Sequence, residues 1–274
     1  MTVLEIAFQG ERGSFSEEAA RRFFGPEITP DPKRTFPEVF TAVESGAADF
    51  GVVPVENSLV GSIHQNYDLL LRRNLKIIGE QNQRIVHHLI VNPGTTLDHL
   101  TSIHSHPVAL DQCKEYLQKH SKLTVVVEYD TAGSVKLIKE QTMNTAGAIA
   151  GAYAAELYEM QILASAIQDE PDNYTRFLIL SKNPAERTER CKTSIVFALK
   201  NIPGVLFKAL SVFALRDLDL TKIESRPLRK KAWEYYFYLD FVGHVDDEAA
   251  RNAVTHLREI TTFLKILGSY PMSE

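Results

Sequence analysis

The feature that most constrains the fold is a short strand followed directly by a polar helix start, which recurs along the first part of the chain. Apolar runs end a few residues before Ser14, Asn57 and Thr131, and these hydroxyl or amide side chains then precede an amphipathic pattern of helical period. In open parallel sheets such polar turns lie at the carboxyl ends of strands, where ligands bind. The pattern predicts an α/β domain with a polar site at the sheet edge.

The order of elements divides this α/β part into two lobes. We expect residues 1–80 and 156–183 to form the first lobe and residues 81–155 to form the second. Two crossings between lobes make a hinged cleft, whose closure can exclude water from a ligand. The expected strands are Val3–Phe8, Phe50–Val53, Ile77–Glu80, Ile85–Val91, Thr124–Glu128 and Ala146–Ala150, and the expected helices are Phe15–Phe24, Phe36–Ser45, Ile63–Leu71, Val108–His120, Val135–Glu140 and Gly151–Tyr158.

The pattern changes after residue 181. Ser181–Thr193 is polar and contains Pro184, which is typical of a linker. Residues 193–274 then follow a βαββαβ order, which predicts a ferredoxin-like α+β domain. Its expected elements are the strands Ser194–Lys200, Leu218–Ser225, Trp233–Phe241 and Phe263–Leu267 and the helices Gly204–Arg216 and Asp246–Arg258.

One stretch concentrates groups suited to chemistry. Gln168–Phe177 contains three acids around Pro171, followed by Asn173, Thr175 and Arg176. Proline blocks a continuing helix, so these groups are expected at a loop or strand entry. An amide, a hydroxyl and a guanidinium suit a small organic anion. A polar strand entry with a surface arginine remains the alternative.

Composition excludes several classes of function. The chain has 274 residues with 44% hydrophobic and 24% charged residues, which is ordinary for a globular protein, and its length favours two domains. A formal charge of -5 argues against nucleic acid as a partner. No apolar run has membrane-spanning length, and the isolated Cys113 and Cys191 predict reduced thiols in a cytoplasmic protein.

The sequence predicts no metal and no cofactor. His87-His88 and His104-Ser105-His106 are the paired histidines, but no nearby cysteine or carboxylate completes a ligand set. We interpret them as polar loop residues. No glycine-rich phosphate loop of the nucleotide-binding types is present.

Several motifs in order resemble those of the monofunctional prephenate dehydratases with a C-terminal ACT domain. The resemblance covers nearly the whole chain, with Ser14 where threonine is usual and Val108 where glutamine is common. The motifs are Gly10–Ser16, Pro54–Ser58 with Gly61, His106-Pro107 through Gln112-Cys113, Asp130–Ser134, Ala154–Tyr158 and the catalytic signature Asn173 with Thr175-Arg176-Phe177, and, in the second domain, Gly204-Val205-Leu206 and Glu224-Ser225-Arg226-Pro227.

The resemblance implies a fold and a reaction. The first domain is expected to be a two-lobed α/β catalytic domain like the type II periplasmic binding proteins, and residues 193–274 an ACT domain. The implied reaction converts prephenate to phenylpyruvate by loss of carbon dioxide and the ring hydroxyl. Thr175 would assist the departing hydroxide by donating a hydrogen bond.

The resemblance also assigns binding roles. Arg176 would bind a substrate carboxylate, or else brace the loop acids Asp169 or Asp172, and Asn173 would act beside it. The expected cleft residues are Ser14, Asn57, Ser58, Ser105, Gln112, Thr131 and Phe177. For most of them, helix capping, turn formation or core packing is the competing role.

The ACT domain implies feedback by L-phenylalanine. The expected effector residues are Gly204, Val205, Leu206, Glu224, Ser225, Arg226 and Pro227. ACT domains commonly pair, so a homodimer or homotetramer is expected. Arogenate dehydratase and a non-catalytic amino-acid sensor remain alternatives.

Overall fold

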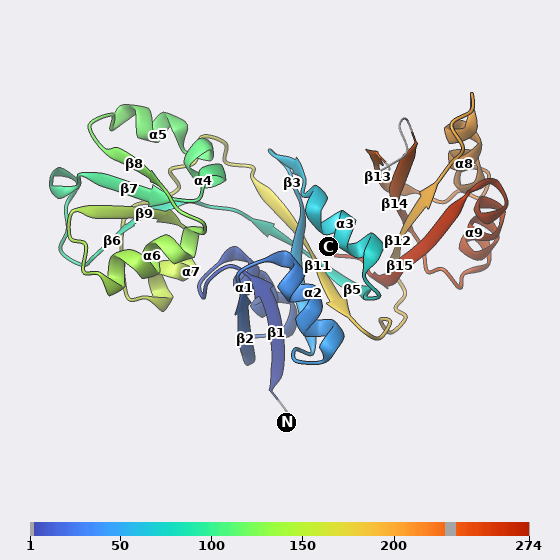
Figure 1. The fold of residues 1–274 in the computed structure, drawn as a ribbon, viewed down its shortest axis with the longest axis horizontal. Helices are drawn as coiled ribbons and strands as arrows, with labels where there is room; N and C mark the ends of the chain where they lie inside the picture. Colours follow the sequence, from blue (N-terminus) through green and yellow to red (C-terminus); the bar gives the residue numbers. More distant parts are fainter. Residues whose placement is uncertain (1–2, 228–233, 274) are drawn as a thin grey trace. The chain divides into compact units, whose positions relative to one another are not determined.

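A computed structural model describes residues 3–227 and 234–273 (Figure 1). Within these ranges the strands form three sheets. The chain separates into two compact units, of which the first contains the residues up to Ile63 together with Gln81–Phe177. The second contains His64–Glu80 and the residues from Leu178 onward.

The first sheet has the strand order β2-β1-β3-β11-β5, and β4 pairs with β3. Strand β1 is parallel to both β2 and β3, so their carboxyl ends lie at one edge. The strands are β1 (Leu4–Gln9), β2 (Ile28–Lys33), β3 (Phe50–Asn57), β4 (Gly61–Ser62), β5 (Lys76–Arg84) and β11 (Tyr174–Ser181), and the helices that follow them are α1 (Phe15–Phe24), α2 (Phe36–Ser45) and α3 (His64–Arg72).

Strand β2 is an element for which we had no sequence-based prediction. It contains Pro30 and Pro32, which pair with Ile6 and Phe8 of β1. Proline cannot donate to a strand ladder, but it is tolerated at a sheet edge, where one side of the strand has no partner. Strand β2 lies at the end of the sheet order, which explains why a proline-containing run can be a strand here.

The second sheet has the order β10-β6-β9-β7-β8. Strand β7 runs parallel to β8 and β9, whereas β6 is antiparallel to both β9 and β10. Its strands are β6 (His88–Val91), β7 (Ser102–Ser105), β8 (Thr124–Val127), β9 (Ala146–Ala150) and β10 (Gln161–Ala164), and its helices are η1 (Leu97–His99), α4 (Pro107–Gln112), α5 (Lys114–Lys119), α6 (Thr131–Glu140) and α7 (Ala152–Leu157).

Two details of the second sheet differ from the sequence-based boundaries. The helix predicted at Val108–His120 is two short helices, which meet at Cys113 with φ -117° and ψ 27°. Strand β10 pairs with β6, although the predicted lobe boundary at residue 155 assigns that segment to the first lobe. The core of this lobe lies on both sheet faces, with α6 and α7 packed on one and α4 on the other.

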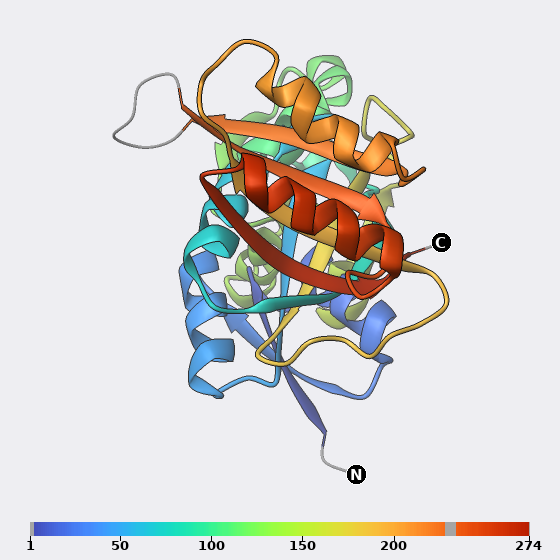
Figure 2. The ribbon, with the colours of Figure 1, turned by 90° about the vertical axis from the view of Figure 1, so that its right-hand side faces the viewer.

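The C-terminal sheet has the order β13-β14-β12-β15 and is antiparallel throughout. Helices α8 and α9 lie side by side on one of its faces (Figure 2). The element order confirms the predicted βαββαβ arrangement, although Trp233, where one predicted strand begins, lies outside the described residues. The elements are β12 (Cys191–Ala198), α8 (Val205–Ala214), β13 (Leu220–Pro227), β14 (Tyr235–Val242), α9 (Glu248–Ile260) and β15 (Phe263–Pro271).

The second unit also includes α3 and the first half of β5. Lys265 donates from its Nζ atom to the carbonyls of Leu70, Leu71 and Arg73 at the end of α3. Lys192 and Glu80 form an ion pair of 2.7 Å between side chains that are 9% and 1% exposed. Helix α3 and the first half of β5 are therefore bonded to strands of the C-terminal sheet.

Candidate functional site

A cavity of about 260 Å³ lies in the first unit, and elements of both α/β lobes form its wall. The first lobe contributes the ends of β1 and β3, the start of α1 and one face of β11. The second lobe contributes residues from both ends of α4 and the start of α6. The lining residues are Gln9, Ser14, Phe15, Ser16, Pro54, Asn57, Val60, Ile63, Ile85, His87, His106, Val108, Ala109, Gln112, Tyr129, Asp130, Thr131, Thr175 and Phe177.

The centre of the first-lobe wall is a buried group of three side chains. Asn57 donates from Nδ2 to Asn173 Oδ1 at 2.6 Å and to Thr175 Oγ1 at 2.9 Å. Its Oδ1 atom accepts from the backbone N–H groups of Leu59 and Val60, each at 3.0 Å, which fixes the orientation of the amide. Because the Thr175 oxygen accepts from Asn57, the hydroxyl hydrogen is left to donate to another acceptor.

Strand geometry separates the residues of the predicted catalytic signature. Thr175 and Phe177 line the cavity, whereas Arg176 between them does not. Successive side chains of a strand point to opposite faces, so the Arg176 side chain leaves β11 on the side away from the cavity. Arg176 is therefore not part of the cavity wall, and its role as a carboxylate ligand stays a prediction. Asn173 is buried behind the wall and holds Asn57.

Two other predicted cleft residues have structural partners. Ser58 accepts from the N–H of Tyr174 at 2.9 Å and donates to the carbonyl of Asp172 at 3.2 Å. Ser105 is fully buried and donates to the carbonyl of Ile149 at 2.6 Å. Neither lines the cavity, so the competing role of turn or strand bonding describes their positions.

The predicted residue Gln112 lines the cavity together with His87, for which we had predicted no role in the site. His87 donates from Nε2 to Gln112 Oε1 at 2.9 Å, and its ring packs edge-on against Phe15. Burial lowers the pKa of His87, which keeps the imidazole neutral. Because the carbonyl end of Gln112 is engaged, its NH₂ group is available to a ligand. His87 lies in the short connection between β5 and β6 and is buried at 2% exposure, which no local sequence signal indicates.

The loop before Asn173 is held by contacts with two other segments. Asp169 accepts at Oδ1 from the N–H of Glu115, at the start of α5, at 3.0 Å. Arg84 donates to the carbonyl of Pro171 from two guanidinium nitrogens, at 3.0 and 3.2 Å. These contacts fasten the loop that leads into Thr175, and they do not pair Asp169 with Arg176.

The cavity presents helix N-termini rather than basic side chains. Of the described residues that line it, none is lysine or arginine. Ser14 caps α1 by accepting from the N–H of Glu17 at 3.3 Å, and Thr131 is the first residue of α6. The N–H groups and dipole of a helix N-terminus favour anions. Burial also lowers the pKa of His106, so this lining histidine favours its neutral form.

Asp130 is the acidic residue of the lining. It caps α6 by accepting from the N–H of Gly133 at 2.6 Å. The other oxygen lies beside Gly10, whose φ is +113° and where an added Cβ atom would come within 2.8 Å of Asp130 Oδ2. Burial raises the pKa of Asp130 to about 6, although the backbone N–H groups of Gly133, Glu11 and Ala132 lower it.

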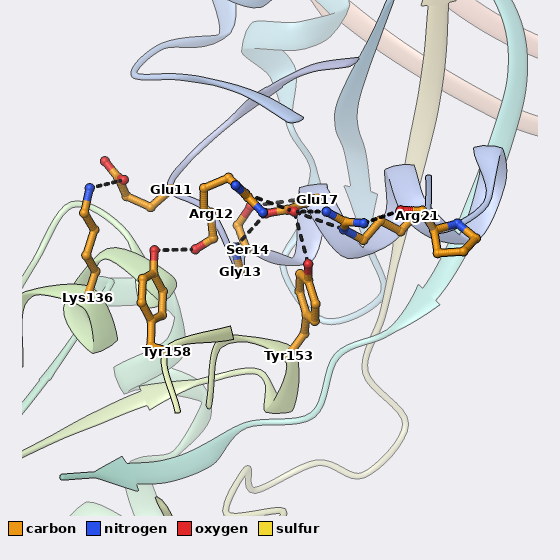
Figure 3. Close-up of polar contacts among 10 residues, drawn as sticks. Glu11, Arg12, Gly13, Ser14, Glu17, Arg21, Lys136, Tyr153 and Tyr158 are labelled. Carbon is orange, nitrogen blue, oxygen red and sulfur yellow. Dashed lines mark hydrogen bonds and ion pairs between the residues drawn. The ribbon is translucent and has the colours of Figure 1, made fainter. Parts of the chain in front are cut away.

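Polar contacts join the two lobes beside the cavity (Figure 3). Lys136 of α6 pairs with Glu11 at 2.9 Å, and Tyr158 donates to the carbonyl of Arg12 at 3.0 Å. Tyr153 of α7 donates to Glu17 at 3.1 Å, and Glu17 is fully buried between Arg12 and Arg21. The lobes are therefore held together around the first turn of α1.

The predicted effector motifs lie in the C-terminal sheet and its helix. Gly204 precedes α8 with φ +74°, and Val205 and Leu206 are the first residues of that helix. Glu224, Ser225, Arg226 and Pro227 end β13. The left-handed backbone at position 204 favours glycine over other residues. The effector role of these residues stays a prediction.

The described ranges contain neither a metal-binding cluster nor a membrane-crossing helix. No three histidine, cysteine, aspartate or glutamate side chains there come close enough together to hold a metal ion. No helix in the same ranges combines the length and the apolar character that a membrane crossing requires. Cys113 and Cys191 are buried free thiols.

Comparison with known proteins gives two family matches. The sequence matches "Prephenate dehydratase" over residues 6–185 and "ACT domain" over residues 193–258. A relative from Arabidopsis thaliana, arogenate dehydratase/prephenate dehydratase 2, chloroplastic, is 48% identical over 280 residues, which are 98% of this chain and 73% of the relative.

Two solved structures are similar over almost the whole chain. Prephenate dehydratase from Arthrobacter aurescens in complex with L-Phe has a TM-score of 0.88 and 31% identity, with 98% of this chain and 90% of that chain covered. GqqA, described as a novel type of quorum quenching acylases, has a TM-score of 0.89 and 36% identity, with 98% of both chains covered. The predicted two-lobed α/β fold with a C-terminal ACT domain is confirmed.

Proposed function

The chain belongs to the prephenate dehydratase family and carries an ACT domain, and we propose that it converts prephenate to phenylpyruvate, carbon dioxide and water. The observation that carries the proposal is the Thr175 hydroxyl in the cavity wall, held as an acceptor by Asn57. This arrangement leaves the hydroxyl hydrogen for a departing oxygen.

The reaction makes limited demands on the protein. The bond between the ring and its carboxylate breaks, and the released electron pair forms a ring double bond. The bond to the ring hydroxyl breaks at the same time, so that hydroxide leaves with its electron pair and the ring becomes aromatic. A hydroxide is a poor leaving group unless a proton or a hydrogen bond reaches it in the transition state.

Thr175 fits the role of this donor. Its side chain is almost completely buried, and Asn57 occupies one acceptor site of the oxygen. A hydrogen bond from a fixed, poorly solvated donor stabilises developing negative charge strongly, because little reorganisation is needed during the reaction. We assign Thr175 to the leaving oxygen and Asn57 to the orientation of Thr175.

The cavity wall offers donors for the substrate carboxylates other than Arg176. We assign them to the N–H groups at the start of α1, near Ser14, and of α6, near Thr131. Gln112 supplies a further donor, because His87 occupies its carbonyl oxygen. Helix N-termini bind anions through fixed N–H groups, which accounts for a cavity that suits an anion without a basic lining residue.

Arogenate is the second candidate substrate. It has an ammonium group where prephenate has a keto oxygen. Asp130 in the cavity lining favours the ammonium-bearing compound, and the Arabidopsis relative is named for both activities.

We further propose that L-phenylalanine regulates the activity through the ACT domain, as part of phenylalanine biosynthesis, and that ACT domains of a homodimer or homotetramer pair. The Arthrobacter aurescens structure was determined in complex with L-Phe. The glycine at 204 and the end of β13 at Glu224–Pro227 are the segments that we assign to the effector.

Replacement of Thr175 by alanine tests the proposed reaction. We expect T175A to lower kcat on prephenate by about a hundred- to a thousandfold with little change in KM, because the lost donor acts in the transition state. T175S is the matched variant, since serine keeps the hydroxyl, and it should retain most activity. Product formation is followed by the absorbance of the phenylpyruvate enolate in base.

The same assay can contradict the proposal in two ways. Near wild-type kcat in T175A would remove Thr175 from the mechanism. A wild-type protein that forms product from neither prephenate nor arogenate would overturn the proposed activity itself.

A further inference from the structure

The charge of the cavity lining is unusual for a site that takes a dianion. Prephenate carries two carboxylates and no positive group, whereas arogenate carries the same two carboxylates and one ammonium. Among the described lining residues the carboxyl group of Asp130 has no lysine or arginine beside it in the wall. A buried carboxylate repels a second negative charge at short range, because the dielectric constant is low there.

The position of Asp130 is fixed from both lobes. Its Oδ1 atom receives the N–H of Gly133 at 2.6 Å, which fastens it to the start of α6. Its Oδ2 atom faces Gly10, whose missing side chain leaves the space that the carboxylate occupies. The side chain is 9% exposed by residue and cannot swing out without losing its cap. The carboxylate is therefore a permanent part of the wall.

Asp130 and Thr175 belong to different lobes. Thr175 lies on β11 of the first sheet, and Asp130 precedes α6 of the second. In the proposed substrate, the ring hydroxyl and the three-carbon side chain are attached to opposite carbons of the ring. With the hydroxyl at Thr175, the side chain points across the cavity, away from the β11 wall and toward the second lobe.

We propose that Asp130 is a specificity-determining residue that selects the amino form of the substrate over the keto form by pairing with its ammonium group. The inference rests on the proposed function of the cavity. Backbone N–H groups of Gly133, Glu11 and Ala132 use three of the roughly four acceptor sites of the carboxylate, so it can accept from an ammonium without releasing its cap. The keto form offers an oxygen at the same place, which a carboxylate cannot bind.

A competition experiment with the full chain measures this selection directly. Prephenate and arogenate are supplied together at equal concentration near pH 8, and the phenylpyruvate and phenylalanine formed give the ratio of the two kcat/KM values. In D130N we expect the amino-to-keto ratio to fall by roughly tenfold to a hundredfold, the usual effect of a charged hydrogen bond. Turnover of prephenate should rise, since a repulsive charge is removed.

Asparagine is the informative replacement because it also caps helices well, so α6 keeps its first turn. E11Q is the matched control. Glu11 is a neighbouring carboxylate that contacts Tyr129 and Lys136 but does not line the cavity. Removal of the Glu11 charge should leave the amino-to-keto ratio the same as in the wild type.

Each outcome decides the proposal. A lower ratio in D130N with a retained ratio in E11Q supports it. An unchanged ratio in D130N, or an equal fall in E11Q, overturns it while leaving the dehydratase function intact. A D130N protein that forms neither product also overturns it, because Asp130 would then serve folding or the chemistry common to both substrates.

Discussion

At the scale of single residues, the site contains polar side chains that are buried and therefore poorly solvated. The Asp130 carboxyl group is the clearest example, because burial raises its pKa from 3.8 to about 6. A raised pKa means that folding disfavours the ionised form. The ion that we assign to substrate selection therefore lowers the stability of the protein at neutral pH.

This cost predicts a pH-dependent difference between D130N and the wild type. Protonated Asp130 stabilises the fold fully below about pH 4, and this contribution is lost as the pH rises through about 6. Asparagine does not ionise. The free energy of unfolding of D130N minus that of the wild type should therefore rise by about 2 to 3 kcal/mol between pH 4 and pH 7.

Urea unfolding of both proteins at several pH values between about 4 and 7 measures this difference. A constant offset between the two curves would show that the Asp130 carboxyl group does not ionise with a raised pKa. The difference in the free energy of unfolding also includes the effect of replacing a carboxylate oxygen by an NH₂ group. The change of this difference with pH is therefore the quantity to compare.

Residue types and motif order sufficed to predict much of the cavity. Ser14, Asn57, Gln112, Thr131, Thr175 and Phe177 all line it. Arg176 does not line it, because strand alternation directs every second side chain of β11 away, and its role stays a prediction. His87 and Asp130 were missed as site residues because a histidine pair and a helix cap look ordinary until a distant segment, at Phe15 or Gly10, is brought beside them.

At the scale of elements, packing overrides local sequence in three places. Strand β2 forms despite its two prolines, because on an edge strand the N–H groups of one side have no neighbouring strand to bond. Cys113 interrupts a helical pattern that is continuous by hydrophobic spacing. The predicted linker ended at Thr193, but β12 begins at Cys191, where the charged Lys192 finds its partner in Glu80 of β5.

The ion pair between β12 and β5 supports a prediction on stability. K192M should lower the free energy of unfolding by about 3 to 5 kcal/mol, because it removes a buried cation that pairs with the Glu80 carboxylate. The double variant K192M/E80Q should recover most of the loss. K122M, at an exposed lysine, is the control and should change stability little.

Thermal and urea unfolding of the four proteins give the comparison. If K192M and K122M were equally stable, the pair would be energetically neutral. If the double variant were no more stable than K192M, the loss would come from packing rather than from an unpaired charge.

At the scale of the whole molecule, the proposed regulation requires that L-phenylalanine bind one state of the protein more tightly than another. The coupling is reciprocal, so L-phenylalanine and substrate must change each other's affinity by the same factor.

We expect L-phenylalanine to change the KM for substrate in the wild type, and G204A to weaken that response at least severalfold. G94A is the matched control. Gly204 and Gly94 have φ of +74° and +85°, and neither has a heavy atom within 4 Å of an added Cβ, so both substitutions impose a similar backbone strain. Titration calorimetry and initial rates, with and without L-phenylalanine, measure the response.

A wild type whose kinetics ignore L-phenylalanine would contradict the regulatory proposal. An equal loss of response in G204A and G94A would contradict the assignment of Gly204, because strain alone would then be responsible.

The division of strand β11 between the two compact units limits how the C-terminal domain can be exchanged between related proteins. Its first residues, including Thr175, belong to the first compact unit, and Leu178–Ser181 belong to the second. Strand β5 is divided in the same way, with its first half in the second unit. Helix α3 belongs entirely to the second unit. A recombination event in the loop between residues 182 and 190 would interrupt neither domain in the sequence. It would nevertheless separate Glu80 from Lys192 and the end of α3 from Lys265. A C-terminal domain exchanged between relatives must therefore bring a compatible His64–Glu80 segment with it, so two distant stretches of the gene have to be exchanged together.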